Sequence, residues 1–225
     1  MGSFLLNVLA SLVAAVLLIL LAAVLSRRAR DLLTALASVF LHIDVKSVFA
    51  DSKEADPLIR EALNRAKEIR ILTGRGRQFQ GDLYDAALVG VSGRKPSVKV
   101  LLPETAVKAQ GTDWVEQRER ELAAHDKSFG NGLLRQQIAA VAAGLAKFVE
   151  AGRFEVRKFD LPHIGRILLT DEYLFLTPYS EAHGRHSRVY QYGRGDTYEM
   201  FSRFFNMAWK DSEDRIVSPI APDEG

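Results

Sequence analysis

The chain opens with a long apolar stretch, residues 4–25, in which no residue is charged and the polar residues are Asn7 and Ser11. As an α-helix this stretch would extend about 33 Å, slightly more than the hydrocarbon core of a bilayer. Its apolar side chains cover every side of the helix, whereas a helix on the surface of a globular domain has a polar face. A cleaved signal peptide fits less well, because no basic residue precedes the stretch and it is too long. The pattern therefore predicts a transmembrane anchor.

Three arginines, Arg27, Arg28 and Arg30, follow the apolar stretch directly. Basic residues flanking a transmembrane helix remain in the cytoplasm, so the rest of the chain is expected there. Apolar residues recur at helical spacing over 31–41, which indicates an amphipathic helix at the membrane surface or a dimer contact. We therefore divide the N-terminal part into an anchor with its basic flank, residues 1–30, and a juxtamembrane helix with a connector, residues 31–55.

From Asp56 onward, helical and extended hydrophobic patterns alternate. Asp56 is interpreted as an N-cap with Pro57 at the first helical position. Helices are expected over residues 57–66, 82–89, 113–124, 133–150 and 197–209. Strands are expected over residues 69–72, 97–102, 154–159, 166–169, 173–177 and 188–192. Gly152 is expected to cap the fourth helix, and the charged residues of the third are interpreted as a solvated face.

This order of elements predicts the fold class. A strand, a helix and a second strand at the start indicate a parallel βαβ unit, and the two strands around Asp171 and Glu172 indicate an antiparallel hairpin. We therefore expect an α/β domain with a mixed sheet over residues 56–212, arranged as a sandwich, and a flexible tail over 213–225. Phe204 and Trp209 of the last helix are expected to be buried.

Composition narrows the chemistry. The chain has no cysteine, which excludes disulfides and thiolate metal sites, and its net charge of +2 is too small to indicate nucleic-acid binding. His183 and His186 have no carboxylate partner at ligand spacing, so neither a metal site nor a cofactor is predicted. Gly74-Arg75-Gly76 matches neither a phosphate-binding loop nor a dinucleotide fingerprint.

Anion-binding residues do gather next to the predicted strands. Arg75 and Arg77 follow the first strand, Arg166 opens the hairpin, and His186 and Ser187 come after it. Ligands of α/β folds bind beyond the carboxyl ends of strands, and arginine suits phosphate. These residues are therefore the candidate ligand-binding site. The alternative interpretation is that they are solvated loop charges.

The stretch 161–176, with His163, resembles the region around the His-Lys-Asp motif of the phospholipase D-like superfamily. The resemblance implies that His163 would be the nucleophile and that a chain with one motif would act as a homodimer. The sequence departs from the motif, because Gly165 stands where the family has Lys and Thr170 where it has Asp. Arg166 and Asp171 each lie one place late. Because side chains alternate along a strand, Arg166 is expected on the opposite face unless a bulge intervenes.

Loss of the motif lysine favours binding over catalysis. The resulting hypothesis is a degenerate phospholipase D-like domain anchored in the bacterial inner membrane, with the domain in the cytoplasm. It would bind a phosphate-bearing ligand, such as a nucleotide or a phospholipid headgroup, or a protein partner. The resemblance implies that such a domain would serve as a sensor or effector, with antiviral defence as one such role. The alternatives are a homodimeric phosphodiesterase or nuclease that uses His163, and a structural subunit of a membrane complex.

Overall fold

The computed structural model describes residues 8–9, 11–19, 44–76, 96–107, 111–152, 154–162, 164–179 and 187–217. Residues 8–9 and 11–19 are helical with exposed side chains. Within the described ranges, no helix combines the length and the apolarity needed to cross a membrane. Much of the predicted anchor, the juxtamembrane helix over 31–41 and the predicted helix over 82–89 lie outside the described residues.

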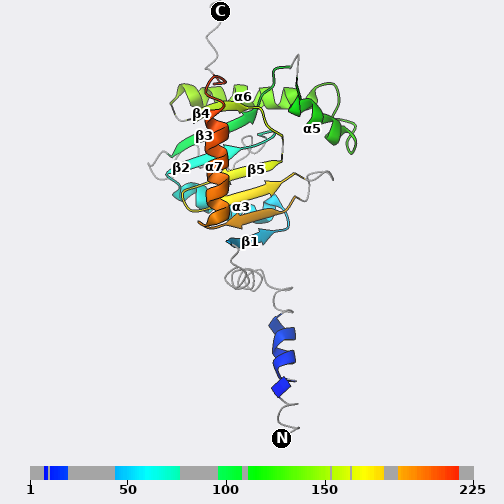
Figure 1. The fold of residues 1–225 in the computed structure, drawn as a ribbon, viewed down its shortest axis with the longest axis vertical. Helices are drawn as coiled ribbons and strands as arrows, with labels where there is room; N and C mark the ends of the chain where they lie inside the picture. Colours follow the sequence, from blue (N-terminus) through cyan, green and yellow to red (C-terminus); the bar gives the residue numbers. More distant parts are fainter. Residues whose placement is uncertain are drawn as a thin grey trace, which may run out of the picture.

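The described part of the chain contains a seven-stranded mixed sheet with the order β1-β7-β6-β5-β2-β3-β4 (Figure 1). Its strands are β1 (Val45–Phe49), β2 (Glu68–Leu72), β3 (Ser97–Pro103), β4 (Phe154–Phe159), β5 (Gly165–Leu169), β6 (Leu174–Pro178) and β7 (Val189–Tyr192). Strands β2, β3 and β4 are parallel, whereas β5, β6, β7 and β1 join antiparallel to their neighbours. The predicted α/β class, the early parallel pairing and the late hairpin are confirmed.

Helices cover both faces of this sheet. The helices are α3 (Ser52–Arg65), α5 (Trp114–Ala123), α6 (Leu133–Glu150) and α7 (Asp196–Lys210). Of the described helices, α3, α5 and α6 share one apolar core with the sheet, and α7 crosses the other face (Figure 1). Gly152, at φ +63°, ends α6 as predicted.

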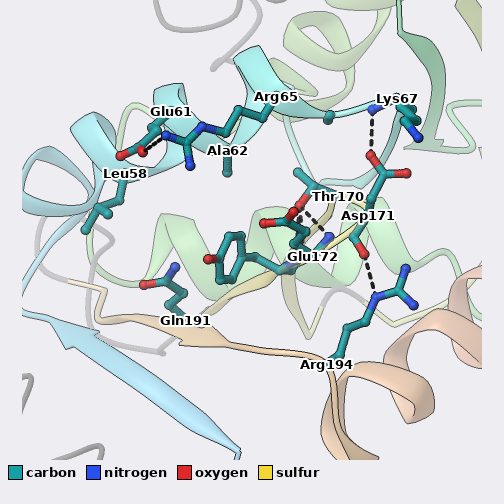
Figure 2. Close-up of a pocket in the computed structure, with 12 residues that line it drawn as sticks. Leu58, Glu61, Ala62, Arg65, Lys67, Thr170, Asp171, Glu172, Gln191 and Arg194 are labelled. Atoms are coloured by element: carbon teal, nitrogen blue, oxygen red, sulfur yellow. Dashed lines mark hydrogen bonds and ion pairs between the residues drawn. The ribbon is translucent and has the colours of Figure 1, made fainter.

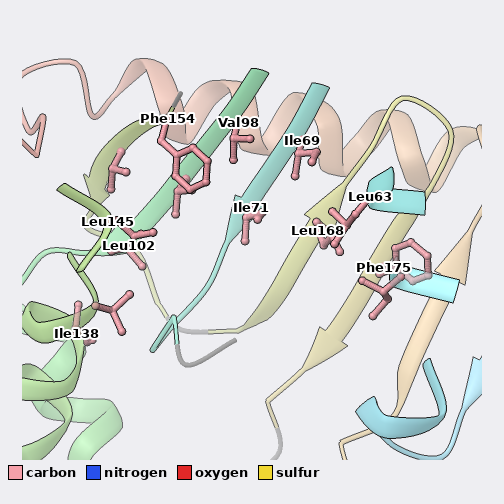
Figure 3. Close-up of a cluster of buried hydrophobic side chains, with 14 of the residues drawn as sticks. Leu63, Ile69, Ile71, Val98, Leu102, Ile138, Leu145, Phe154, Leu168 and Phe175 are labelled. Carbon is pink, nitrogen blue, oxygen red and sulfur yellow. The ribbon is translucent and has the colours of Figure 1, made fainter. Parts of the chain in front are cut away.

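Successive side chains of a strand point to opposite faces of the sheet, so each strand contributes residues to both apolar cores. In β2, Ile69 and Ile71 face α3 and α6, whereas Leu72 faces α7. Figure 3 shows the first of these cores, with side chains from the sheet meeting Leu63 of α3 and Ile138 of α6. Because both faces are buried, the central strands read as nearly continuous apolar runs.

The predicted connector is wrong, because residues 45–49 form edge strand β1. The first helix also begins earlier than predicted, at Ser52 rather than Pro57. Asp51 is its N-cap and accepts a hydrogen bond from the Glu54 N–H at 2.9 Å. The Glu54 carboxylate in turn accepts from the Ala50 N–H at 2.8 Å. These two hydrogen bonds define the start of the helix at Ser52, and Pro57 lies inside the helix, where it removes one helical hydrogen bond.

The tail is held as far as residue 217, which corrects the predicted flexible segment in its first part. Ile216 forms a bridge with Arg157 of β4, and the Val217 N–H donates to the Val156 carbonyl at 3.0 Å. The predicted solvated face of α5 is also wrong in part, because Glu119 is buried. Its carboxylate accepts from the Leu134 N–H at 3.3 Å and so caps α6, which has no acidic residue in its first turn.

Candidate functional site

The predicted ligand residues that the structure describes lie at one edge of the sheet. This edge, which we call the β2-end edge, contains the carboxyl ends of β2 and β6 and the starts of β5 and β7. Arg75 follows β2, Arg166 opens β5, and Ser187 precedes β7. His163, Arg77 and His186 lie outside the described residues, so their positions are not part of this geometry.

Gly74 and Tyr179 form the centre of the β2-end edge. The Gly74 N–H donates to the Tyr179 hydroxyl oxygen at 2.9 Å. A Cβ at position 74 would lie 2.9 Å from Cε2 of the same ring, so a larger residue here would displace the Tyr179 ring. Thr73 before it is buried, and its N–H donates to the Leu101 carbonyl at 3.2 Å. The turn after β2 is therefore fixed on both sides.

Two guanidinium groups stack on aromatic rings beside this turn. Arg75 lies over Phe129, with 4.3 Å from Cζ to the ring centroid. Arg118 of α5 lies over Tyr179 at 5.4 Å and pairs with Glu121 at 2.7 Å. Stacking contacts the flat face of a guanidinium, whereas its five N–H donors point outward in the plane and suit bidentate oxyanions.

Arg166 has different surroundings. Its Nη2 donates to Thr177 Oγ1 at 3.1 Å and contacts Ser52 Oγ at 3.5 Å, which ties β5 and β6 to the start of α3. Burial raises the pKa of the nearby Asp56 carboxyl, and the guanidinium groups of Arg166 and Arg60 oppose that rise. Arg166 contacts Thr177 and Ser52, whereas Arg75 stacks on Phe129, so the two arginines share an edge of the sheet and have different partners there.

The pairing of β5 with β6 shows where the side chains lie in the stretch that resembles the His-Lys-Asp motif. Pairing runs one to one from Gly165↔Pro178 to Leu169↔Leu174, without a bulge that could turn Arg166 to the other face. Gly165, which stands where the motif lysine would be, is buried. A Cβ there would lie 2.8 Å from the Thr177 carbonyl oxygen and 3.1 Å from Pro178 Cα. The backbone of β6 therefore leaves no room for a side chain at this position.

Sequence reasoning missed Arg118 and Tyr179. Arg118 belongs to a helix rich in charged residues, most of them at least partly exposed, and its spacing does not distinguish it from them. Tyr179 directly follows β6, and nothing in its sequence position distinguishes it from the other aromatic residues of the chain. Among the described residues, no group of three or more histidine, aspartate or glutamate side chains is placed to hold a metal ion.

The comparisons with known proteins give weak similarities. No protein-family model and no curated protein match the chain. Among solved structures, it is similar to TrmBL2, an archaeal chromatin protein with a novel mode of DNA binding, at 17% identity and a TM-score of 0.46, over 97% of this chain and 71% of that one. It is also similar to the phosphatidylserine synthase of Haemophilus influenzae Rd KW20, at 13% identity and a TM-score of 0.44, over 74% of this chain and 38% of the synthase. At these TM-scores neither neighbour indicates a ligand or an activity for this chain.

Proposed function

We propose that this chain is a membrane-anchored, cytoplasmic binding protein with a degenerate phospholipase D-like domain. Its ligand bears a phosphate, as a nucleotide or a phospholipid headgroup does, and binds at the β2-end edge. The ligand residues in this proposal are Arg75, Arg77, Arg166, His186 and Ser187, with Arg118 added from the geometry. The domain would act as a sensor or effector beside the bacterial inner membrane, where a bound ligand or protein partner is recognised.

The observation that carries this proposal is a pair of arginines stacked on aromatic rings, Arg75 on Phe129 and Arg118 on Tyr179. Arg75 and Arg118 come from separate elements, and both lie beside the turn at Gly74. Their planar donors are the groups that proteins use to bind phosphate oxygens, whereas the N–H groups of Gly74 and Gly76 already donate to Tyr179 and Thr73. The lack of room at Gly165 supports binding over phosphodiester cleavage, because the family's oxygen-holding lysine has no counterpart on that side of the strand.

Binding of phosphate should depend on these arginines. With the full chain in detergent, we expect Arg75→Ala and Arg118→Ala each to weaken binding by about 1.5–3 kcal/mol, the usual contribution of a charged hydrogen bond. Arg120→Ala is the matched control on the same helix, because the Arg120 side chain is 73% exposed and pairs with Glu116. Calorimetric titration with a mononucleotide and with soluble phosphatidic acid distinguishes a nucleotide from a headgroup, and raised salt should weaken either.

The same samples test the enzymatic alternative. Wild type and His163→Ala are incubated with a generic phosphodiester in the presence of a chelator. We expect neither to cleave it above background. Metal-independent cleavage that wild type shows and His163→Ala lacks, with folding retained, would replace the binding proposal by a homodimeric phosphodiesterase. Equal phosphate binding by wild type, Arg75→Ala and Arg118→Ala would remove the proposed site.

Topology is tested separately. Because Arg27, Arg28 and Arg30 follow the apolar stretch, we expect a reporter fused after Gly225 to be active only if it functions in the cytoplasm. The measurement compares a cytoplasmic and a periplasmic reporter at the same position. Replacing the three arginines by glutamine should weaken this bias. Activity of the periplasmic reporter on the unmodified chain would contradict the proposed orientation.

A further inference from the structure

A cavity of about 510 Å³ lies at the edge of the sheet opposite the β2-end edge. It is enclosed by the C-terminal half of α3, the turn between β5 and β6, and strand β7 (Figure 2). Its volume is within the range of small-molecule sites in proteins. Of the described residues of the phosphate site proposed above, Arg75, Arg118, Arg166 and Ser187 do not line this cavity, and neither does Tyr179.

Gln191 is the most informative residue of this cavity. It is 6% exposed and extends from β7 toward α3 (Figure 2). Within the described part of the chain, its side chain makes no hydrogen bond, although its amide carries two donors and an acceptor. A buried amide without partners costs about 1–3 kcal/mol. Gln191 is one of the residues that line the cavity. The amide therefore opens into the cavity.

The remaining walls combine one further polar group with an apolar surface. Tyr173 lines the cavity, and in the described residues its hydroxyl likewise has no hydrogen-bond partner. Leu58, Ala62 and Ala66 supply an apolar wall from α3 and the residue after it. Such a site accepts a flat molecule with polar groups on its edge.

Charges around the cavity compensate one another. Glu61 pairs with Arg65 at 2.7 Å, and the Asp171 carboxylate accepts from the Lys67 N–H at 2.5 Å (Figure 2). Arg194 Nε donates to the Asp171 carbonyl at 2.7 Å. With Glu172, the lining acids equal the lining bases in number. A ligand with net charge would meet no excess of the opposite sign here, which favours an uncharged ligand.

We propose that this cavity binds a nucleoside through its base. A carboxamide presents a donor beside an acceptor in one plane and pairs with a base edge that offers the complementary pair, as glutamine does with adenine. Gln191 makes this contact, the Tyr173 hydroxyl adds a hydrogen bond, and the apolar wall on α3 covers a face of the base. The phosphate site at the opposite edge is not required for this binding.

The test uses the full chain in detergent and saturation-transfer NMR with adenosine, guanosine, cytidine and uridine. We expect saturable binding of at least one nucleoside. Gln191→Leu, which keeps the volume and removes the amide, should weaken it at least tenfold. Tyr173→Phe, which removes a single hydroxyl, should weaken it severalfold while the thermal midpoint stays near wild type. This second variant keeps the test valid if Gln191→Leu unfolds.

Gln137→Leu is the matched control, because it makes the same change on α6, away from this cavity. It should bind nucleosides as wild type does. The proposal is overturned if no nucleoside binds, or if folded Gln191→Leu and Tyr173→Phe both bind like wild type. Binding of adenosine monophosphate without binding of any of the four nucleosides would also overturn it, since the phosphate site alone would then account for the binding. Arg75→Ala should leave nucleoside binding unchanged, which separates this test from that of the phosphate site.

Discussion

Phe205→Ala is expected to lower the free energy of unfolding by about 3–5 kcal/mol, the range for removing a fully buried phenylalanine. Phe205 is 0% exposed at the centre of the core between α7 and the sheet. Its ring stacks on Trp209, with 5.8 Å between centroids. Among the described helices, α7 alone packs on this face of the sheet, so none of the others can fill the resulting cavity. Denaturant unfolding of the full chain in detergent, followed by circular dichroism, measures the change.

Phe204→Ala is the matched control. Phe204 is only partly buried at the margin of the same core, so its loss should cost less than half as much. Equal costs for the two variants would contradict the orientation of α7. A cost below about 1 kcal/mol for Phe205→Ala would place its ring outside a packed core.

This pair shows what the sequence could and could not predict about α7. The helix itself was predictable from its apolar residues at helical spacing, and its observed bounds, Asp196–Lys210, extend the prediction by one residue at each end. Phe204 was predicted to be buried and is only partly buried. Neighbouring residues lie about 100° apart around a helix, so Phe204 and Phe205 cannot both point at the sheet. Which of them does so depends on the rotation of α7 against the sheet.

The burial of Arg70 could not be predicted from the sequence. It lies inside an apolar strand and yet is buried, on the face covered by α7. Its Nη1 donates to Ser202 Oγ at 2.8 Å and to Asn206 Oδ1 at 3.3 Å. These partners lie more than 130 residues away in the sequence, and only the packing of α7 brings them to the guanidinium. A buried charge is tolerated where such hydrogen bonds exist, and periodicity cannot reveal them.

The candidate site was predictable only in part. Strand order brings Arg75 and Arg166 to one edge of the sheet, because β5 runs antiparallel to β2. The contact of Arg118 with Tyr179 depends on how α5 lies against that edge. Edge strand β1 was missed for a related reason. Its five residues include exposed Lys46 and Val48, so its alternation is weak, and its pairing with β7 defines it.

Gly165→Ala is expected to destabilise the domain by about 3 kcal/mol, the upper end of the range for overpacking. The added methyl would lie 2.8 Å from the Thr177 carbonyl oxygen. That oxygen belongs to the backbone of the neighbouring strand, so it cannot move aside as a flexible side chain can. Thermal and denaturant unfolding of the full chain measure the loss.

Gly144→Ala makes the same chemical change where nothing lies within 4 Å of the added atom, on an exposed position inside α6. It should raise stability by about 0.5–1 kcal/mol, because alanine favours helix over glycine. Stability changes of opposite sign in the two variants would show that position 165 has no room for a side chain. If Gly165→Ala is instead as stable as wild type, β6 can yield at this point. A lysine could then be accommodated where the phospholipase D-like motif carries one, and the argument against catalysis from this strand would fail.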